Sequence, residues 1–138
     1  MTQNERDLLI KDLCARLPYN VKIKIKTYED IDEIDSIGTL CQLNKQYFWI
    51  LEDEYERCIE YNKPYLLPLS SMTDEDHAIY SKIWEDTGKT AYLEGCHHLI
   101  STIKAYKAAN DFLLSKHYDI NGLIPKDLAN DATGLNIY

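Results

Sequence analysis

The chain of 138 residues contains only five glycines, and it lacks the short motifs that accompany common nucleotide and hydrolase chemistry. It contains no glycine-rich phosphate loop, GxSxG elbow or HExxH pair. These absences exclude the motif-based classes of phosphate-binding and hydrolytic enzymes. A catalytic role would need residues brought together from distant parts of the chain.

Long apolar runs are also missing. No stretch approaches the roughly 20 apolar residues of a membrane-spanning helix. The first residues, MTQNERDLLIKDL, carry charges where a signal peptide needs an apolar core. We therefore expect a cytoplasmic protein without a membrane partner.

Cysteines are few and widely separated. Cys14, Cys41, Cys58 and Cys96 form no CxxC pair. In a cytosolic protein this spacing favours reduced thiols over disulfides or a metal site. We expect no metal and no cofactor.

Positive charge is in deficit, since 15 basic residues against 23 acidic ones give a net charge of −8. Nonspecific nucleic-acid binding needs clustered Lys and Arg to replace counterions, and anionic membranes attract the same residues. The negative net charge therefore argues against binding to nucleic acids and to anionic membranes. The acidic clusters are expected to be solvated faces, with DNA mimicry as the alternative.

A change of pattern occurs within the stretch KPYLLPLSSMTDED, residues 63–76. Apolar residues alternate before it and recur at helical spacing after it. Pro64 and Pro68 restrict residues 65–67 to a short or edge strand. The sequence therefore predicts one α+β domain over residues 1–138. An N-terminal helix and a small sheet would occupy residues 1–69, and a helical part would occupy residues 70–138.

The first half predicts one helix followed by several short strands. Thr2 and Glu5 fit a capping box, and the helix over 3–17 should stop at Pro18. Strands are expected over 21–26, 34–43, 46–51, 57–60 and 65–67, with an acidic loop at 28–33 and a bulge at Gly38. So many short strands favour a curved antiparallel sheet over residues 20–69, with an SH3-like barrel as its closed form.

The strand over 46–51 has apolar residues on both faces. Tyr47, Trp49 and Leu51 lie on one face, whereas Phe48 and Ile50 lie on the other. We expect a central strand or one covered on both sides.

The second half predicts helices over 73–86 and 99–117 that pack around the sheet. The first should end near Thr87-Gly88, and residues 89–96 fit either a loop or a strand. A short last helix is expected between Pro125 and Gly134. The long helix has a stripe expected to be buried, consisting of Leu99, Ile103, Tyr106, Asn110 and Leu113.

A row of lysines is the strongest basic feature. Strand alternation puts Lys22, Lys24 and Lys26 on one face, with ammonium groups about 6–7 Å apart, which suits neighbouring phosphates. Aromatic residues could stack on a base, and the candidates are Tyr47, Trp49 and Tyr65. Competing ligand candidates are Glu29, Asp30, Asp32 and Glu33. The alternative is three lysines in water.

The histidines are the remaining candidates for metal binding or acid/base catalysis. His97 and His98 are adjacent, so their side chains diverge on a strand or a helix and do not easily bind one metal. His117 and Asp119 follow the long helix, where a cationic His is a C-terminal cap favoured by the dipole, or half of an acid/base pair. We prefer the cap. A small hydrolase using His97, His98 or His117 is the enzymatic alternative.

Three blocks carry a resemblance: DLLIKDLCARLPYNVKIKI, KPYLLPLSSMTDED and DFLLSKHYDINGLIPKDLAN. Together they resemble a family of small uncharacterised proteins encoded by phages, prophages and mobile elements of gut Bacteroides-type bacteria. Residues 28–62 and 87–98 depart from that pattern. The resemblance implies an accessory viral gene and host-cell cytoplasm, and it brings no catalytic residues.

These observations predict a non-enzymatic binder, a phage accessory protein with a counter-defence role. It would sequester a nucleotide immune signal or block a host protein. A structural or regulatory module without a ligand is a further alternative. The many large aromatic rings also predict a homo-oligomer, because aromatic residues favour interfaces.

Overall fold

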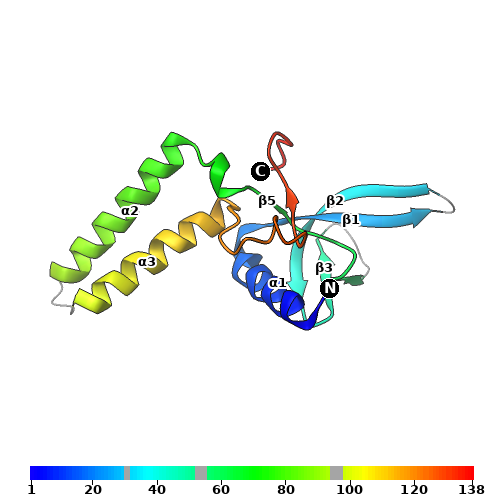
Figure 1. Cartoon of the computed structure of the whole chain (residues 1–138), viewed down its shortest axis with the longest axis horizontal. Coiled ribbons are helices and arrows are strands. Elements are labelled where there is room, and N and C mark those ends of the chain that lie inside the picture. Colours follow the sequence, from blue (N-terminus) through cyan, green and yellow to red (C-terminus); the bar gives the residue numbers. More distant parts are fainter. Residues whose placement is uncertain (30–31, 52–55, 94–97) are drawn as a thin grey trace.

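The computed structural model describes residues 1–29, 32–51, 56–93 and 98–138. Figure 1 shows an elongated molecule with helix α1 and a curled sheet in its central body. The outer ends of strands β1 and β2 extend to one side, and a hairpin of helices α2 and α3 extends to the other. The α+β class is confirmed.

Helix α1, Gln3–Arg16, begins at the predicted capping box. The Thr2 hydroxyl accepts from the Glu5 amide at 3.3 Å, and the Glu5 carboxylate accepts from the Thr2 amide at 2.7 Å. Pro18 lies in a 3-10 turn, Leu17–Tyr19, directly after the helix. Both boundaries follow from local chemistry, because the cap satisfies free amides and proline cannot continue the ladder.

A buried ion pair joins α1 to the segment after α3. Arg16 donates to both oxygens of Asp12 at 2.6 and 3.1 Å, and both side chains are fully buried. Arg16 also donates to the carbonyl of Tyr118 at 2.7 Å, and the Asn121 amide donates to Asp12 at 2.7 Å. The pair connects two segments about 100 residues apart in sequence.

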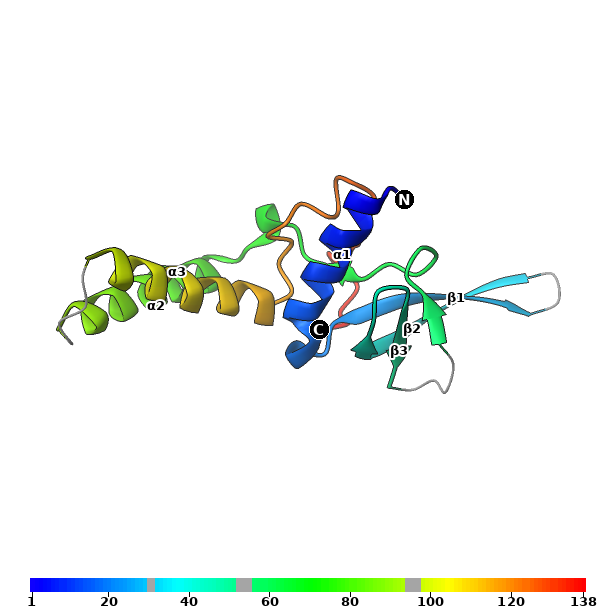
Figure 2. The same cartoon turned by 90° about the horizontal axis from the view of Figure 1, so that it is seen from below.

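The main sheet has four antiparallel strands in the order β1-β2-β3-β4. They are β1 Lys22–Glu29, β2 Asp32–Leu43, β3 Tyr47–Ile50 and β4 Glu56–Cys58. Its inner face packs on α1 and forms the core, which includes Leu9, Leu13, Ile23, Ile25, Leu40, Phe48 and Ile50. In the described ranges β1 and β4 do not pair, so the sheet is a curled half-barrel (Figure 2).

Three details of the sheet differ from expectation. Residues 28, 29, 32 and 33 belong to β1 and β2, so the loop expected over 28–33 is wrong. The register shifts between Leu40 and Gln42 rather than at Gly38. Gly38 is required by packing instead, because a Cβ there would overlap Ile50 Cγ2 and Ile25 Cδ1.

Strand β3 is interior in the sheet, as predicted, but only one of its faces is covered. Phe48 and Ile50 are buried, whereas Tyr47 and Leu51 are exposed. Of the two alternatives, the central strand is therefore confirmed, and the exposed Tyr47 and Leu51 rule out the second.

The segment after Pro64 does not extend the main sheet, although Pro64 itself forms an isolated antiparallel bridge with Ile23 of β1. Strand β5, Tyr65–Leu66, pairs in parallel with β6, Asn130–Asp131, so the single sheet expected over 20–69 is wrong. The last helix expected after Pro125 is also absent from the described residues, which form turns there. The predicted helical part therefore returns to the body, where Leu123, Leu128 and Ala129 join the core.

Helices α2, Asp74–Leu93, and α3, His98–Ser115, pack along each other and project away from the sheet (Figures 1 and 2). Two predictions fail here: α2 continues past Thr87-Gly88, and the hairpin does not pack around the sheet. One glycine inside a helix costs about 1 kcal/mol, which does not end a helix supported by a neighbour. In the part of the chain that is described, no helix has the length and apolarity to cross a membrane.

Candidate functional site

A cavity of about 490 Å³ lies where the hairpin joins the body. Five stretches of the chain line it, with Tyr19, Asn20, Lys22, Leu67, Asp76, Ser115, Lys116, His117, Ile137 and Tyr138. The volume and the mixture of apolar walls with a few polar groups are typical of ligand pockets. We call this space the junction cavity.

Tyr138 and His117 form a stacked pair at this cavity. Their ring centroids are 3.7 Å apart and the ring planes differ by 14°. The Tyr138 hydroxyl donates to the Tyr65 carbonyl at 2.5 Å and accepts from the Lys22 amide at 3.0 Å. Burial raises the pKa of Tyr138 to about 12, so its hydroxyl stays protonated and can donate.

His117 follows the end of α3 in a left-handed conformation, with φ of 62°. Burial, with the nearby charges of Arg16 and Lys22, lowers its pKa to about 4. The imidazole is therefore neutral at pH 7, and the expected cationic cap is wrong. A buried cation beside Arg16 would lose hydration and be repelled.

Asp119 does not pair with His117 for acid/base chemistry. Its two oxygens accept from the amides of Leu123 and Ile124 at 2.8 and 2.9 Å. The carboxylate thus organises the turn that leads the chain back to the body. The side chain that contacts His117 is the Tyr138 ring, which supplies no general base.

The base of the hairpin is held by a polar clasp. Asp76, in the first turn of α2, accepts from the Tyr118 hydroxyl at 2.8 Å and pairs with Lys116 at 3.1 Å. Burial opposes ionisation, but these donors together keep the pKa of Asp76 below its usual value. Backbone bonds between Leu67 and residues 117 and 119, at 2.9 and 2.8 Å, add to the attachment. The hairpin is therefore fixed at its root.

The side chains of the three predicted ligand-binding lysines lie in different surroundings. Lys22 reaches the junction cavity, and its ammonium donates to the Thr39 hydroxyl at 2.7 Å. Lys24 pairs with Asp35 at 2.5 Å on the neighbouring strand. Lys26 is half-buried, and its backbone amide donates to Asn62 at 3.0 Å. Of the three, only Lys22 lines this cavity.

The predicted aromatic partners are not gathered around the lysines. Tyr47 and Trp49 lie on β3, which β2 separates from β1. Tyr65 is connected to Lys22 through the Tyr138 hydroxyl. Asp30 lies outside the described residues, as do the side chains of Glu29, Asp32 and Glu33.

Other candidate reactive groups have structural roles or fall outside the described residues. Thr73 caps α2 by accepting from the Asp76 amide at 3.1 Å, and Ser71 donates to the Pro68 carbonyl at 2.7 Å. Cys14, Cys41 and Cys58 are free thiols. His97, Cys96 and the side chain of His98 lie outside the description. Across the described ranges, no group of three His, Cys, Asp or Glu could hold a metal.

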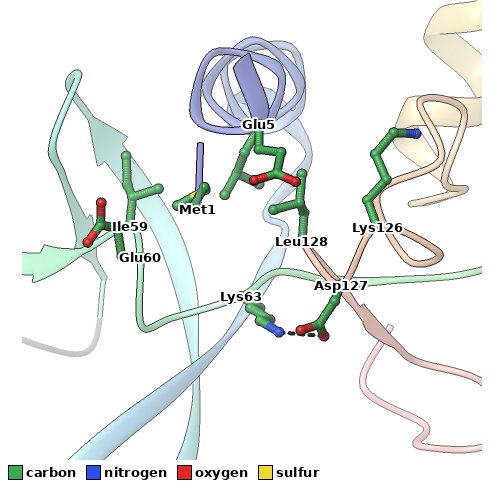
Figure 3. A pocket seen from close by; sticks show the side chains of 9 residues that line it. Met1, Glu5, Ile59, Glu60, Lys63, Lys126, Asp127 and Leu128 are labelled. Atoms are coloured by element: carbon green, nitrogen blue, oxygen red, sulfur yellow. Dashed lines mark hydrogen bonds and ion pairs between the residues drawn. The ribbon is translucent and has the colours of Figure 1, made fainter. Parts of the chain in front are cut away.

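A second, smaller cavity of about 290 Å³ lies between α1, the segment after β4 and the turn before β6 (Figure 3). Apolar walls from Leu9, Ile59 and Leu128 meet charged groups at its edge. Lys63 and Asp127 pair there at 2.5 Å, and Lys126 points away. Its two lysines are outnumbered by three carboxylates, Glu5, Glu60 and Asp127. The junction cavity has two lysines and one carboxylate, so the smaller cavity offers less to an anion.

The exposed side of the hairpin is the largest departure from the predicted core. Leu99, Ile103 and Tyr106 follow each other at i, i+4 and i+7, yet 62, 58 and 61% of each residue is exposed. The stripe expected to be buried thus faces water along most of its length. The buried residues of the projecting part of α3 are small, at positions 101, 105 and 109, whereas Leu113 and Leu114 are buried near its end at the body.

Helix α2 extends this apolar stripe. Trp84 meets Tyr106 edge to face, with centroids 6.2 Å apart and planes at 87°. A groove of about 510 Å³ beside this pair is lined by Tyr80, Ser81, Trp84, Glu85 and Tyr106. We call the surface formed by Tyr80, Trp84, Leu99, Ile103 and Tyr106 the hairpin face. Helical periodicity signalled the stripe, but Tyr80 was missed because its neighbours depend on how the helices pack.

We compared the chain with protein-family models, with curated proteins and with solved structures, and none of them matched it. The functional assignment therefore depends on the geometry of the junction cavity and the hairpin face. These two sites have different chemistry, since charged side chains such as Lys22, Asp76 and Lys116 line the junction cavity, whereas the hairpin face consists of apolar and aromatic side chains.

Proposed function

We propose that this protein is a non-enzymatic binding protein that docks another protein on the hairpin face. The exposure of Leu99, Ile103 and Tyr106 at helical spacing carries the proposal. Contiguous apolar surface of this kind marks interaction sites, and an amphipathic helix offers such a stripe to a partner. The clasp at Asp76 and Lys116 presents the face on a fixed root.

An enzymatic role has less support. The neutral His117 lies against Tyr138, and Asp119 is occupied by backbone amides. Neither side chain is placed to transfer a proton with the other. The function therefore follows from surface complementarity.

The biological setting proposed here comes from the sequence resemblance. A phage or mobile-element protein with an apolar docking face suits counter-defence by blocking a host protein in the host cytoplasm. Nucleotide sequestration has a smaller basis, because the lysine row is divided between a cavity and an ion pair.

The test is capture from an extract of a Bacteroides-type bacterium with three baits. The first is the unmodified protein, and the second carries Leu99→Gln, Ile103→Gln and Tyr106→Gln. The third is a matched control with Leu51→Gln, Ile37→Gln and Tyr61→Gln, which removes the same residue types from exposed positions in the body.

We expect a protein captured by the unmodified bait to be lost with the hairpin variant and retained with the control. Loss with both variants, or retention with both, would refute docking on the hairpin face. Circular dichroism of all three baits confirms that each is folded.

The junction cavity supports a second candidate function, binding of a small anionic ligand such as a nucleotide. Lys22 and Lys116 both reach a cavity that has aromatic walls. Calorimetry with nucleotides should show binding that Lys22→Ser abolishes and Lys24→Ser preserves, since Lys24 lies outside the cavity. Equal affinities for the two variants would exclude this site.

A further inference from the structure

We infer that the occupant of the hairpin face is a second copy of this chain. Two hairpins would pack face to face into a four-helix bundle, with α2 of each copy on α3 of the other. The inference rests on the proposed function, because it names the partner of the same surface. Three observations support it.

The first observation is a missing layer. On α3 the buried residues of the projecting part are Ser101, Ala105 and Ala109, which are small. The large residues Leu99, Ile103 and Tyr106 remain in water. Helices normally bury their apolar stripe against a second layer, and in four-helix bundles that layer is another helical pair. A second hairpin of this chain supplies such a pair with the same stripe.

The second observation is the size of the surface. Helices of 18 and 20 residues are roughly 27–30 Å long, and two of them side by side are about 20 Å wide. A stable interface buries about 800 Å² of accessible surface on each partner. The flat footprint of such a face is about 540–600 Å², and the side chains that project from it add accessible surface toward the required area. The groove beside Trp84 alone covers only a small part of that footprint.

The third observation is charge. Of the five carboxylates on α2, Asp74, Glu75 and Asp76 lie in its first turn, at the root of the hairpin. Beyond that turn α2 carries Glu85 and Asp86 with two lysines, whereas α3 carries two lysines and one carboxylate. Placing α2 on α3 of the second copy brings the neighbouring acids Glu85 and Asp86 toward the more basic helix. Trp84 and Tyr106 are in contact, so their neighbours Glu85 and Lys107 lie at the same height on the hairpin. Both are exposed, and each would meet its opposite on the second copy.

A twofold arrangement explains why this occupant suits the face better than an arbitrary protein. The symmetry operation presents the acidic pair Glu85 and Asp86 of each copy to the more basic α3 of the other. The surface is thus complementary to itself in both charge and apolar pattern.

Light scattering after size exclusion across the micromolar range tests the inference. We expect twice the chain mass of 16.1 kDa for the unmodified protein and 16.1 kDa for the variant with Leu99→Gln, Ile103→Gln and Tyr106→Gln. The matched control with Leu51→Gln, Ile37→Gln and Tyr61→Gln should remain a dimer. If the triple hairpin variant does not fold, Ile103→Gln alone should still raise the dissociation constant.

Charge reversal tests the pairing of the helices. Glu85→Lys should weaken the dimer about three- to tenfold, and adding Lys107→Glu to it should restore the affinity. If the double variant is weaker than Glu85→Lys alone, α2 does not lie on α3 of the partner.

A monomer at every concentration, or a dimer that survives loss of the hairpin face, would overturn the inference. In the monomer case the capture experiment still decides the proposed function. If a host protein is captured by the unmodified bait and lost only with the hairpin variant, the hairpin face is still a docking site, but its occupant is not a second copy. If both experiments are negative, the proposed function fails as well.

Discussion

Helices α1 and α3 both carry leucines and isoleucines at helical spacing, yet they place them in different surroundings. In α1, Leu9 and Leu13 are covered by the sheet and the returning chain. In α3, Leu99 and Ile103 are exposed, whereas the buried residues beside them are the small Ser101, Ala105 and Ala109. An apolar stripe at helical spacing therefore identifies a helix face that packs against other residues. It does not show whether those residues belong to the same chain or to a partner.

The two regions also differ in how polar groups are used. The body encloses the pair Arg16–Asp12, which connects distant segments. The hairpin carries its charges on the outside, where Glu85 and Lys89 form only an exposed contact at 3.6 Å. Stability should therefore depend on the body, and binding should depend on the hairpin.

The largest expected effect is on the buried ion pair. Asp12→Ala would leave the Arg16 guanidinium buried without its carboxylate, and we expect a loss of about 3–5 kcal/mol in the free energy of unfolding. Urea denaturation followed by circular dichroism measures it. A loss below about 1 kcal/mol would show that the pair does not hold the body together.

A matched pair of leucines tests the comparison directly. Leu13→Ala should cost about 2–5 kcal/mol, because it opens a cavity in the core. Leu99→Ala should change the stability of the monomer by less than about 0.5 kcal/mol, because its side chain is exposed. Denaturation at concentrations where the protein is monomeric gives both values, and similar losses would contradict the division of roles.

The next effect concerns pH. The pKa of His117 is about 4 in the folded protein, below its ordinary value of 6.5, so between these values the unfolded chain binds more protons. Above pH 6.5 protonation of His117 does not reduce the free energy of unfolding. As the pH drops from 6.5 toward 4, the free energy of unfolding falls by roughly 3 kcal/mol.

Denaturation at a series of pH values checks this expectation. His117→Phe should remove most of that slope, whereas His77→Gln, at an exposed position on α2, should preserve it. An unchanged slope in His117→Phe would assign the acid sensitivity to other groups.

The smallest effect is expected at the clasp between the two regions. Tyr118→Phe removes the hydroxyl that donates to Asp76, at a cost of about 0.5–1.5 kcal/mol. Hydrogen exchange should accelerate at the root of the hairpin more than in the sheet. Uniform acceleration would indicate that the body and the hairpin open as one unit.

Local chemistry alone determined much of the fold. The capping box at Thr2 and Glu5, the stop at Pro18 and the alternation in Lys22–Lys26 all appear where predicted. Each depends on contacts within a few residues, so the sequence contains the whole cause. For the candidate sites, it identified Lys22, whereas it assigned the stripe of Leu99, Ile103 and Tyr106 to the core.

Tertiary structure decided where those features face. The pairing of β5 with β6 joins residues 65 and 130, and the neutral state of His117 depends on burial under Tyr138 beside Arg16. No local pattern encodes such contacts, because they depend on how the chain returns to the body. The same reason applies to α3, where helical periodicity marks an apolar side but only packing decides whether the sheet or water lies against it.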